Sequence, residues 1–229
     1  MIRAEGVGVE IDGARILSGV SAELDQPRIA VIGANGSGKS TFARTLNGLV
    51  APTEGRVEVR GIDPAREPKR ARSAVGFLFS NPDAQILMPT PREDLALSLR
   101  AAGVPKGQVP VLMTEALARF GLADRGDQPA HSLSGGQKQL LALAAVLIRE
   151  PRVVIADEPT TLLDLGNARR MARLLLGEED GPIAEQTVIV THDLDLARRC
   201  DVALHFADGN LVAQGDPGEV IAHYVREFA

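Results

Sequence analysis

The sequence has almost no cysteine, and this absence excludes several kinds of protein. Cys200 is the single cysteine among 229 residues, so the chain can form neither an internal disulfide nor a cysteine cluster that binds zinc. A reducing cytoplasm is the simplest setting for such a chain. The first eight residues contain an acidic residue and two glycines instead of a basic, apolar leader, so we expect no export signal.

Long apolar runs and an excess of positive charge are also missing. The longest apolar run, Leu140–Ile148, has nine residues, whereas a bilayer span needs about 20. Any role at a membrane therefore requires a partner subunit. The net charge of −5 argues against a nucleic-acid footprint over the whole chain, and we expect no nucleic-acid partner.

The remaining composition is that of a globular α/β protein. With 45% hydrophobic residues, the chain can bury a full core in one domain and still hold an inserted subdomain. Alternating apolar residues over 1–24, with a turn signal at Asp12-Gly13, predict antiparallel strands. Two further strands are predicted at 57–61 and 75–79.

The middle of the sequence changes to helical periodicity. Ala, Leu, Arg and Glu dominate residues 92–148, and Gly103, Pro105 and Gly107 mark a loop between helices. Apolar strands return at 153–156 and 187–190, as expected of parallel strands that are buried on both faces. The helical segment 165–176 between them predicts a β-α-β crossover.

A glycine-rich segment after the apolar run 29–32 carries the first functional signal. It reads Gly33-Ala34-Asn35-Gly36-Ser37-Gly38-Lys39-Ser40-Thr41 and fits the Gly-x-x-x-x-Gly-Lys-Ser/Thr phosphate loop. The strand before it and the helix-forming residues after it favour this interpretation over a glycine-rich turn with an incidental lysine. We expect backbone N–H groups to bind a nucleoside triphosphate, Lys39 to reach the β- and γ-phosphates and Ser40 to ligate Mg²⁺.

Two carboxylates follow the buried strand 153–156. Asp157 and Glu158 are expected at the carboxyl end of a parallel strand, where α/β sheets place their ligand chemistry. We predict that Asp157 holds Mg²⁺ through water and that Glu158 acts as the general base on the attacking water. An acidic loop without catalytic function is the alternative.

A second helix start also offers phosphate-binding groups. Leu133 precedes Ser134-Gly135-Gly136-Gln137, which opens a helix and presents free N–H groups at its positive end. By itself the segment is equally consistent with an ordinary helix N-cap. Its occurrence together with the phosphate loop and the Asp157-Glu158 pair favours a role in binding phosphate.

Taken together and in this order, the motifs resemble those of the ATP-binding cassette (ABC) ATPases, the nucleotide-binding subunits of ABC transporters. The resemblance covers nearly the whole chain and implies that two copies sandwich two ATP molecules head to tail, so that Ser134 and Gly136 of one copy face the γ-phosphate bound by the other. It further implies that His192 is the switch histidine that contacts the γ-phosphate and that Asp164 lies in the loop that contacts the partner. The other histidines, His131, His205 and His223, match no motif, and their spacing predicts no metal site.

Two positions depart from the family pattern. The family usually has a glutamine where this chain has Ser80, whose hydroxyl is too short for the same metal contact without a bridging water; Gln85 lies five residues on and does not take that place. An aromatic residue that often stacks on adenine is replaced here by Ile11. The lost stacking is about 1–3 kcal/mol by analogy with base–aromatic contacts, and we expect weak discrimination among purine nucleotides.

The segment 79–86, with Asn81-Pro82-Asp83-Ala84-Gln85, resembles the ATPases of energy-coupling factor (ECF) importers, which take up vitamins and transition-metal ions. The surroundings of the phosphate loop and a short C-terminal segment, expected to carry no regulatory domain, are most similar to proteobacterial biotin-importer ATPases. A cobalt or nickel importer is the nearest alternative. An ABC ATPase of DNA repair or translation is a further one, although such proteins typically add coiled coils or a second cassette.

These expectations amount to a P-loop NTPase (RecA-like) α/β core with an N-terminal antiparallel β subdomain and an inserted α-helical subdomain. We predict a single ABC ATPase domain over 1–229, with the core and β subdomain at about 1–80 and 149–229 and the helical subdomain at about 81–148. The resemblance implies ATP and Mg²⁺ as cofactors, and as partners a second copy or a homologous ATPase, a transmembrane coupling subunit and a substrate-binding membrane subunit. It places the chain at the cytoplasmic face of the cell membrane.

Overall fold

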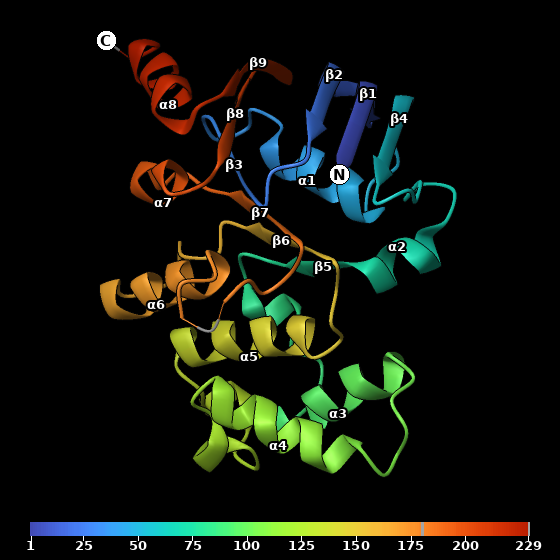
Figure 1. Ribbon diagram of the computed structural model, residues 1–229, viewed down its shortest axis with the longest axis vertical. Coiled ribbons are helices and arrows are strands. Elements are labelled where there is room, and N and C mark those ends of the chain that lie inside the picture. Colours follow the sequence, from blue (N-terminus) through green and yellow to red (C-terminus); the bar gives the residue numbers. More distant parts are fainter. Residues whose placement is uncertain (180, 229) are drawn as a thin grey trace.

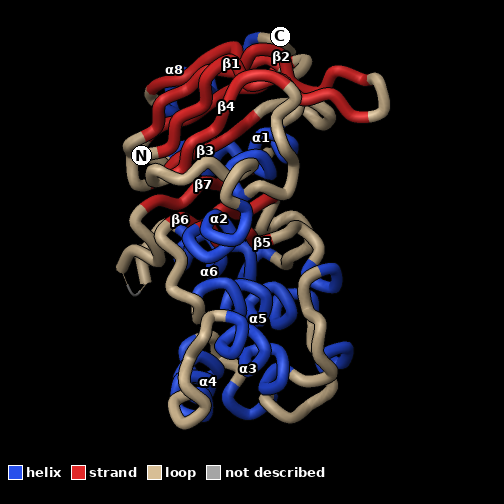
Figure 2. The backbone as a smooth tube through the Cα atoms, turned by 90° about the vertical axis from the view of Figure 1, so that its right-hand side faces the viewer, coloured by secondary structure: helices blue, strands red, loops and turns tan. Residues whose placement is uncertain are grey.

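A computed structural model describes residues 1–179 and 181–228 of the chain. The strands gather in the upper part of the molecule and helices α3, α4 and α5 form the lower part (Figures 1 and 2). The strands are β1 Ile2–Ile11, β2 Ala14–Leu24, β3 Arg28–Ile32, β4 Glu54–Val59, β5 Val75–Leu78, β6 Val153–Asp157, β7 Gln186–Val190, β8 Val202–Ala207 and β9 Asn210–Gly215. The α-helices are α1 Lys39–Asn47, α2 Pro68–Ala74, α3 Pro91–Ala101, α4 Val109–Arg119, α5 Gly135–Leu147, α6 Leu165–Leu175, α7 Leu194–Arg198 and α8 Pro217–Arg226, and short 3-10 helices cover η1 Pro82–Ala84, η2 Ala123–Arg125 and η3 Ala130–Ser132.

The N-terminal part forms the predicted antiparallel sheet. Its strand order is β2-β1-β4, and β1 and β2 are joined by a turn in which Asp12 and Gly13 have φ of 50° and 79°. The strand predicted at 57–61 is instead β4, because Arg60 and Gly61 adopt positive φ and turn the chain after Val59. These turn residues therefore determine where β1 and β4 end.

The larger sheet has six strands in the order β5-β6-β7-β3-β8-β9. All neighbouring pairs are parallel except β8 and β9, which form an antiparallel hairpin at one edge. The predicted crossover is present, since α6 connects the adjacent parallel strands β6 and β7. This arrangement brings the carboxyl ends of β3, β6 and β7 to one edge of the sheet.

Helices α1 and α5 pack on opposite faces of this sheet. Val153 and Ile155 of β6 share a core cluster with Phe42 of α1, whereas Val154 and Ala156 belong to the cluster formed with α5. Successive residues of a strand point to opposite faces, so a buried apolar run serves both helices. The fold is therefore the predicted α/β P-loop core.

The lower part of the molecule consists mainly of α3, α4 and α5. The segment from Ala102 to Gln108 separates α3 from α4, and Gly103 has a φ of 79° within it, as the breaker residues predicted. Among the described residues, no helix combines the length and the apolar character that a membrane crossing demands. The division of the chain at residues 81 and 148 stays a prediction.

Candidate functional site

The glycine-rich loop leaves the end of β3 and turns directly into α1. Gly38 has a φ of 97°, and a Cβ atom on it would lie 2.7 Å from Cδ2 of Leu17 and 3.0 Å from the carbonyl oxygen of Ile16. Since an L side chain rarely adopts this conformation, glycine is needed here both for the backbone and for the close approach of β2. The phosphate loop therefore packs closely against β2 of the antiparallel sheet.

The loop presents a set of hydrogen-bond donors that the rest of the described chain does not use. Within the described residues no hydrogen bond employs the backbone N–H groups of Gly38, Lys39, Ser40 and Thr41, and the buried hydroxyl of Ser37 also has no partner. Gly33 lies buried before these donors, whereas Ala34, Asn35 and Gly36 are exposed. Free N–H groups at a helix N-terminus attract anions, so this part of the structure fits a polyphosphate.

Lys39 is folded back over the loop. Its Nζ donates hydrogen bonds to the carbonyl oxygens of Gly33 at 2.8 Å and Ala34 at 2.7 Å, and the residue is only 6% exposed. Burial lowers the pKa of Lys39, and the nearby carboxylates of Glu158 and Asp157 act in the opposite direction. An anion bound at the loop would favour the charged amine by the same electrostatic effect.

The two residues predicted to hold Mg²⁺ contact each other, although 117 positions separate them. Ser40 Oγ donates to Oδ1 of Asp157 at 2.7 Å, and Nη2 of Arg44 lies 3.7 Å from Oδ2. Burial raises the pKa of Asp157, while the Ser40 and Arg44 contacts oppose the shift. A hydroxyl and a carboxylate oxygen side by side are ligands that Mg²⁺ prefers, so the residues fit this ion.

Glu158 and His192 also contact each other directly, which the motifs alone do not predict. Nδ1 of His192 lies 2.7 Å from Oε2 of Glu158, and Thr161 Oγ1 donates to the same carboxylate oxygen at 3.2 Å. Glu158 has a φ of 50°, and its N–H donates to the carbonyl oxygen of Val190 at 2.9 Å. Non-glycine residues in the left-handed conformation are found preferentially at active sites, where the surrounding structure holds them.

The N-terminus of α5 lies beside that of α6. Ser134 and Gln137 form a capping box, in which each side chain accepts a hydrogen bond from the other residue's backbone N–H. A Cβ atom on Gly136 would lie 2.5 Å from Cγ of Asn167, and a Cβ atom on Gly135 would lie 3.6 Å from the carbonyl oxygen of Leu162. These glycines therefore allow the two helix ends to approach each other.

Asp164 caps α6 through Asn167, a residue that the sequence motifs did not identify. Its Oδ1 accepts from the Asn167 N–H at 2.9 Å, and its Oδ2 accepts from Nδ2 of Asn167 at 2.7 Å. These hydrogen bonds lower the pKa of Asp164. Because Asn167 also contacts Gly136, it joins the Asp164 loop to the start of α5.

The two candidate phosphate-binding segments stay separate within one chain. No hydrogen bond or ion pair of residues 1–179 and 181–228 connects Ser134–Gln137 with the phosphate loop, and α5 and α1 cover opposite faces of the sheet (Figure 1). The Asp157, Glu158 and His192 side chains, in contrast, gather at the sheet edge that carries Lys39 and Ser40.

The two residues that depart from the family pattern, Ser80 and Ile11, lie at or just after the ends of strands. Ser80 is half-buried just after β5, while Gln85 is turned back, accepting from the Phe79 N–H at 3.1 Å and donating to the carbonyl oxygens of Phe77 and Ala142. Gln85 thus fastens the chain after β5 to α5. Ile11 is 43% exposed at the end of β1.

The histidines outside the motifs differ in their surroundings. His131 is exposed, but His205 is fully buried on β8 and its Nδ1 lies 3.2 Å from Nδ1 of His223 on α8. The sequence did not predict this contact, because it depends on the packing of α8 against β8.

The comparisons with known proteins agree with this geometry. A family model described as ABC transporter matches residues 17–161. A biotin transport ATP-binding protein, BioM, of Rhizobium etli is 42% identical over 229 residues, which cover 100% of this chain and 99% of the relative. The BioM of Rhodobacter capsulatus is 38% identical over 219 residues, which cover 96% of this chain and 92% of that protein.

Solved structures show the same fold. The structure of cbiO1 from Clostridium perfringens, described as part of the ABC transporter complex cbiONQ, aligns with a TM-score of 0.84 and 30% identity, covering 99% of this chain and 92% of that chain. A dimeric post-hydrolysis structure of the ATP-binding cassette MJ0796, bound to ADP and Pi, aligns with a TM-score of 0.80 and 26% identity over 95% of this chain and 99% of that chain. The chain described here therefore belongs to the ABC transporter family and is one of its ATPases.

Proposed function

We propose that this chain is the ATPase of an ECF-type importer and that the imported vitamin is biotin. The observation that carries the proposal is the similarity to the Rhizobium etli protein named for biotin transport. The two sequences are 42% identical over the whole of this chain and 99% of that protein. The relative from Rhodobacter capsulatus bears the same name, and a relative from Bacillus subtilis, 37% identical over 209 residues, is named an energy-coupling factor transporter ATP-binding protein.

ATP hydrolysis is assigned to the residues at the edge of the parallel sheet. The free N–H groups of the phosphate loop and Lys39 bind the phosphates. Ser40 and Asp157 would hold Mg²⁺, which supplies neutralisation of phosphate charge when bound. Glu158 serves as general base for the attacking water, and His192, which contacts Glu158 through Nδ1, contacts the γ-phosphate.

Closure of a head-to-tail dimer explains why the second phosphate-binding segment lies apart from the first. In the proposed dimer, Ser134–Gln137 of one copy reaches the phosphates bound by the other, and the Asp164 loop contacts the partner. The segment 80–85 passes the closing motion to a transmembrane coupling subunit, which also carries a substrate-binding membrane subunit. This assembly places the chain at the cytoplasmic face of the cell membrane.

The test is the ATPase activity of the purified chain alone and after co-expression with its genomic membrane neighbours, with Glu158→Gln as the inactive control. We expect activity to rise with the membrane subunits and to vanish in the variant. Uptake of labelled biotin by cells that express the complete set should then depend on Glu158. Activity that is indifferent to any membrane partner would overturn the importer proposal and favour an ABC ATPase of DNA repair or translation.

The same cells distinguish the nearest alternative substrates. If labelled cobalt or nickel accumulates in place of biotin, the ECF-type motor stands and the vitamin assignment fails. The co-purified substrate-binding membrane subunit gives an independent result, because a biotin importer should retain biotin on that subunit and a metal importer should not.

A further inference from the structure

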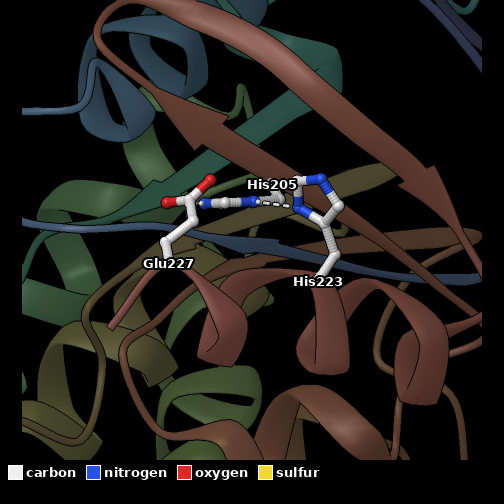
Figure 3. Close-up of side chains that lie close together, drawn as sticks. All are labelled: His205, His223 and Glu227. Carbon is white, nitrogen blue, oxygen red and sulfur yellow. Dashed lines mark hydrogen bonds and ion pairs between the residues drawn. The ribbon is translucent and has the colours of Figure 1, made fainter. Parts of the chain in front are cut away.

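Three side chains that the nucleotide site does not use meet where α8 packs on β8. His205 lies on β8, His223 lies on α8, and Glu227 caps the end of that helix, four residues after His223 (Figure 3). One potential ligand atom can be chosen from each residue so that all three atoms lie within 4.8 Å of one another. Residues four apart on a helix share one face, which places His223 and Glu227 on the side of His205.

His223 and Glu227 each lie about one ligand–ligand separation from a ring nitrogen of His205, but from different nitrogens. His205 stands between the other two, with its Nδ1 3.2 Å from Nδ1 of His223 and its Nε2 3.5 Å from Oε2 of Glu227 (Figure 3). In a tetrahedral site with bonds of about 2.1 Å, ligand atoms are about 3.4 Å apart. One ion can bind only one nitrogen of His205. The three ligand atoms lie within 4.8 Å of one another, so a side-chain rotation has to bring the most distant of them to about 3.4 Å from the others.

The burial of the three residues differs in a way that suits an ion entering from solvent. The His205 side chain is 0% exposed, and among the described residues its Nε2 receives no hydrogen bond. A buried ring nitrogen without a hydrogen bond is unfavourable, and coordination of a cation would satisfy it. His223 is half-buried and the Glu227 side chain is 39% exposed, so an ion can reach both from solvent.

The types of ligand atom that these three residues offer favour one class of metal ion. Two imidazoles and one carboxylate suit Zn²⁺ and related transition metals, whereas Mg²⁺ and Ca²⁺ prefer sites made of oxygen atoms. With three protein ligands, a fourth position is left for water. The His205 ring is also packed edge-on against Tyr224, with ring centroids 4.9 Å apart, which fixes its orientation.

We propose that His205, His223 and Glu227 form a binding site for one divalent transition-metal ion of the Zn²⁺ type. The bound ion fastens α8 to β8, since one ligand comes from the strand and two come from the helix and its cap. His205 is paired in the sheet with Ile32, which immediately precedes the phosphate loop, and Glu227 lines a pocket of about 180 Å³ together with residues 34–37 of that loop. The site therefore lies directly behind the phosphate loop, and its existence does not depend on which compound is imported.

The experiment measures Zn²⁺ binding to the full, metal-free chain by competition with a chromophoric chelator, together with the melting temperature. We expect one Zn²⁺ per chain and a rise in melting temperature of about 5–10 °C when free Zn²⁺ exceeds its dissociation constant about 100-fold. His223→Ala and Glu227→Gln should each weaken binding by at least about tenfold, and His223→Ala should remove the rise in melting temperature. Alanine is favourable within a helix, so His223→Ala is expected to fold, and its melting temperature without metal checks this.

Two control variants locate the ion. His192→Ala removes the imidazole at the other contact between a histidine and a carboxylate, and His131→Ala removes an exposed histidine; both should bind Zn²⁺ as the unmodified chain does. The proposal is overturned if the chain binds no stoichiometric Zn²⁺, if binding survives both His223→Ala and Glu227→Gln, or if His192→Ala abolishes it. The last result would place the ion at the nucleotide site instead.

Discussion

Gly33 is the position in the phosphate loop where one added methyl group should do the most damage. Its φ is 144°, and a Cβ atom there would lie 2.1 Å from the carbonyl oxygen of Phe206 and 2.9 Å from Oγ of Ser37. The Phe206 carbonyl belongs to β8, which is paired with β3, so it cannot move without disturbing the sheet. The unfavourable backbone conformation costs about 1–3 kcal/mol and the forced packing about 1–3 kcal/mol more. We expect Gly33→Ala to lower the free energy of unfolding by about 2–6 kcal/mol and the melting temperature by roughly 5–20 °C.

A matched variant in the same loop separates the two contributions. Gly36 has a φ of 80°, but a Cβ atom on it would meet no atom within 4 Å, so Gly36→Ala should cost only the backbone term of about 1–2 kcal/mol. The assay is urea unfolding followed by circular dichroism, because the chain has no tryptophan for fluorescence. Equal losses of unfolding free energy in Gly33→Ala and Gly36→Ala would show that the β8 backbone does not demand glycine at position 33.

Three further predictions concern the dimer, the start of α5 and the pH dependence of stability. Glu158→Gln should retain ATP binding, lose hydrolysis and accumulate as an ATP-bound dimer in size-exclusion chromatography; a monomer with bound ATP would contradict the sandwich arrangement. Gly136→Ala places a Cβ atom 2.5 Å from Cγ of Asn167, so we expect a loss of about 1–3 kcal/mol in urea unfolding that Asn167→Ala largely relieves, whereas strictly additive losses would count against this contact. The hydrogen bonds with Arg28 lower the pKa of Asp201, so the pair stabilises the fold above the usual aspartate pKa and stops doing so as the pH falls through the lower pKa of the folded state. Asp201→Asn should accordingly cost about 1 kcal/mol near neutral pH and progressively less as the pH falls through the lowered pKa of Asp201, and a difference from wild type that does not change with pH would contradict the assignment.

Features that depend on residues close together in the chain could be predicted from residue patterns. The phosphate loop could be identified because glycines and a lysine at fixed spacing between an apolar run and a helix have one well-defined use. The hairpin at Asp12-Gly13 and the two strands around α6 followed from turn residues and from apolar runs of strand length. The exact end of β4 was missed by two residues, since Arg60 takes up a left-handed conformation that its residue type does not favour.

Which distant residues share a site depends on how the strands and helices pack in three dimensions. The order of the six strands, with β7 next to β6 and β8 next to β3, brings His192 to Glu158 and sets His205 behind the phosphate loop. Local patterns do not encode this order, because any buried parallel strand has the same apolar character. The contacts between Ser40 and Asp157 and between His205 and His223 depend on tertiary packing. The first connects helix α1 and strand β6 across 117 positions, and the second arises only because α8 folds back onto β8.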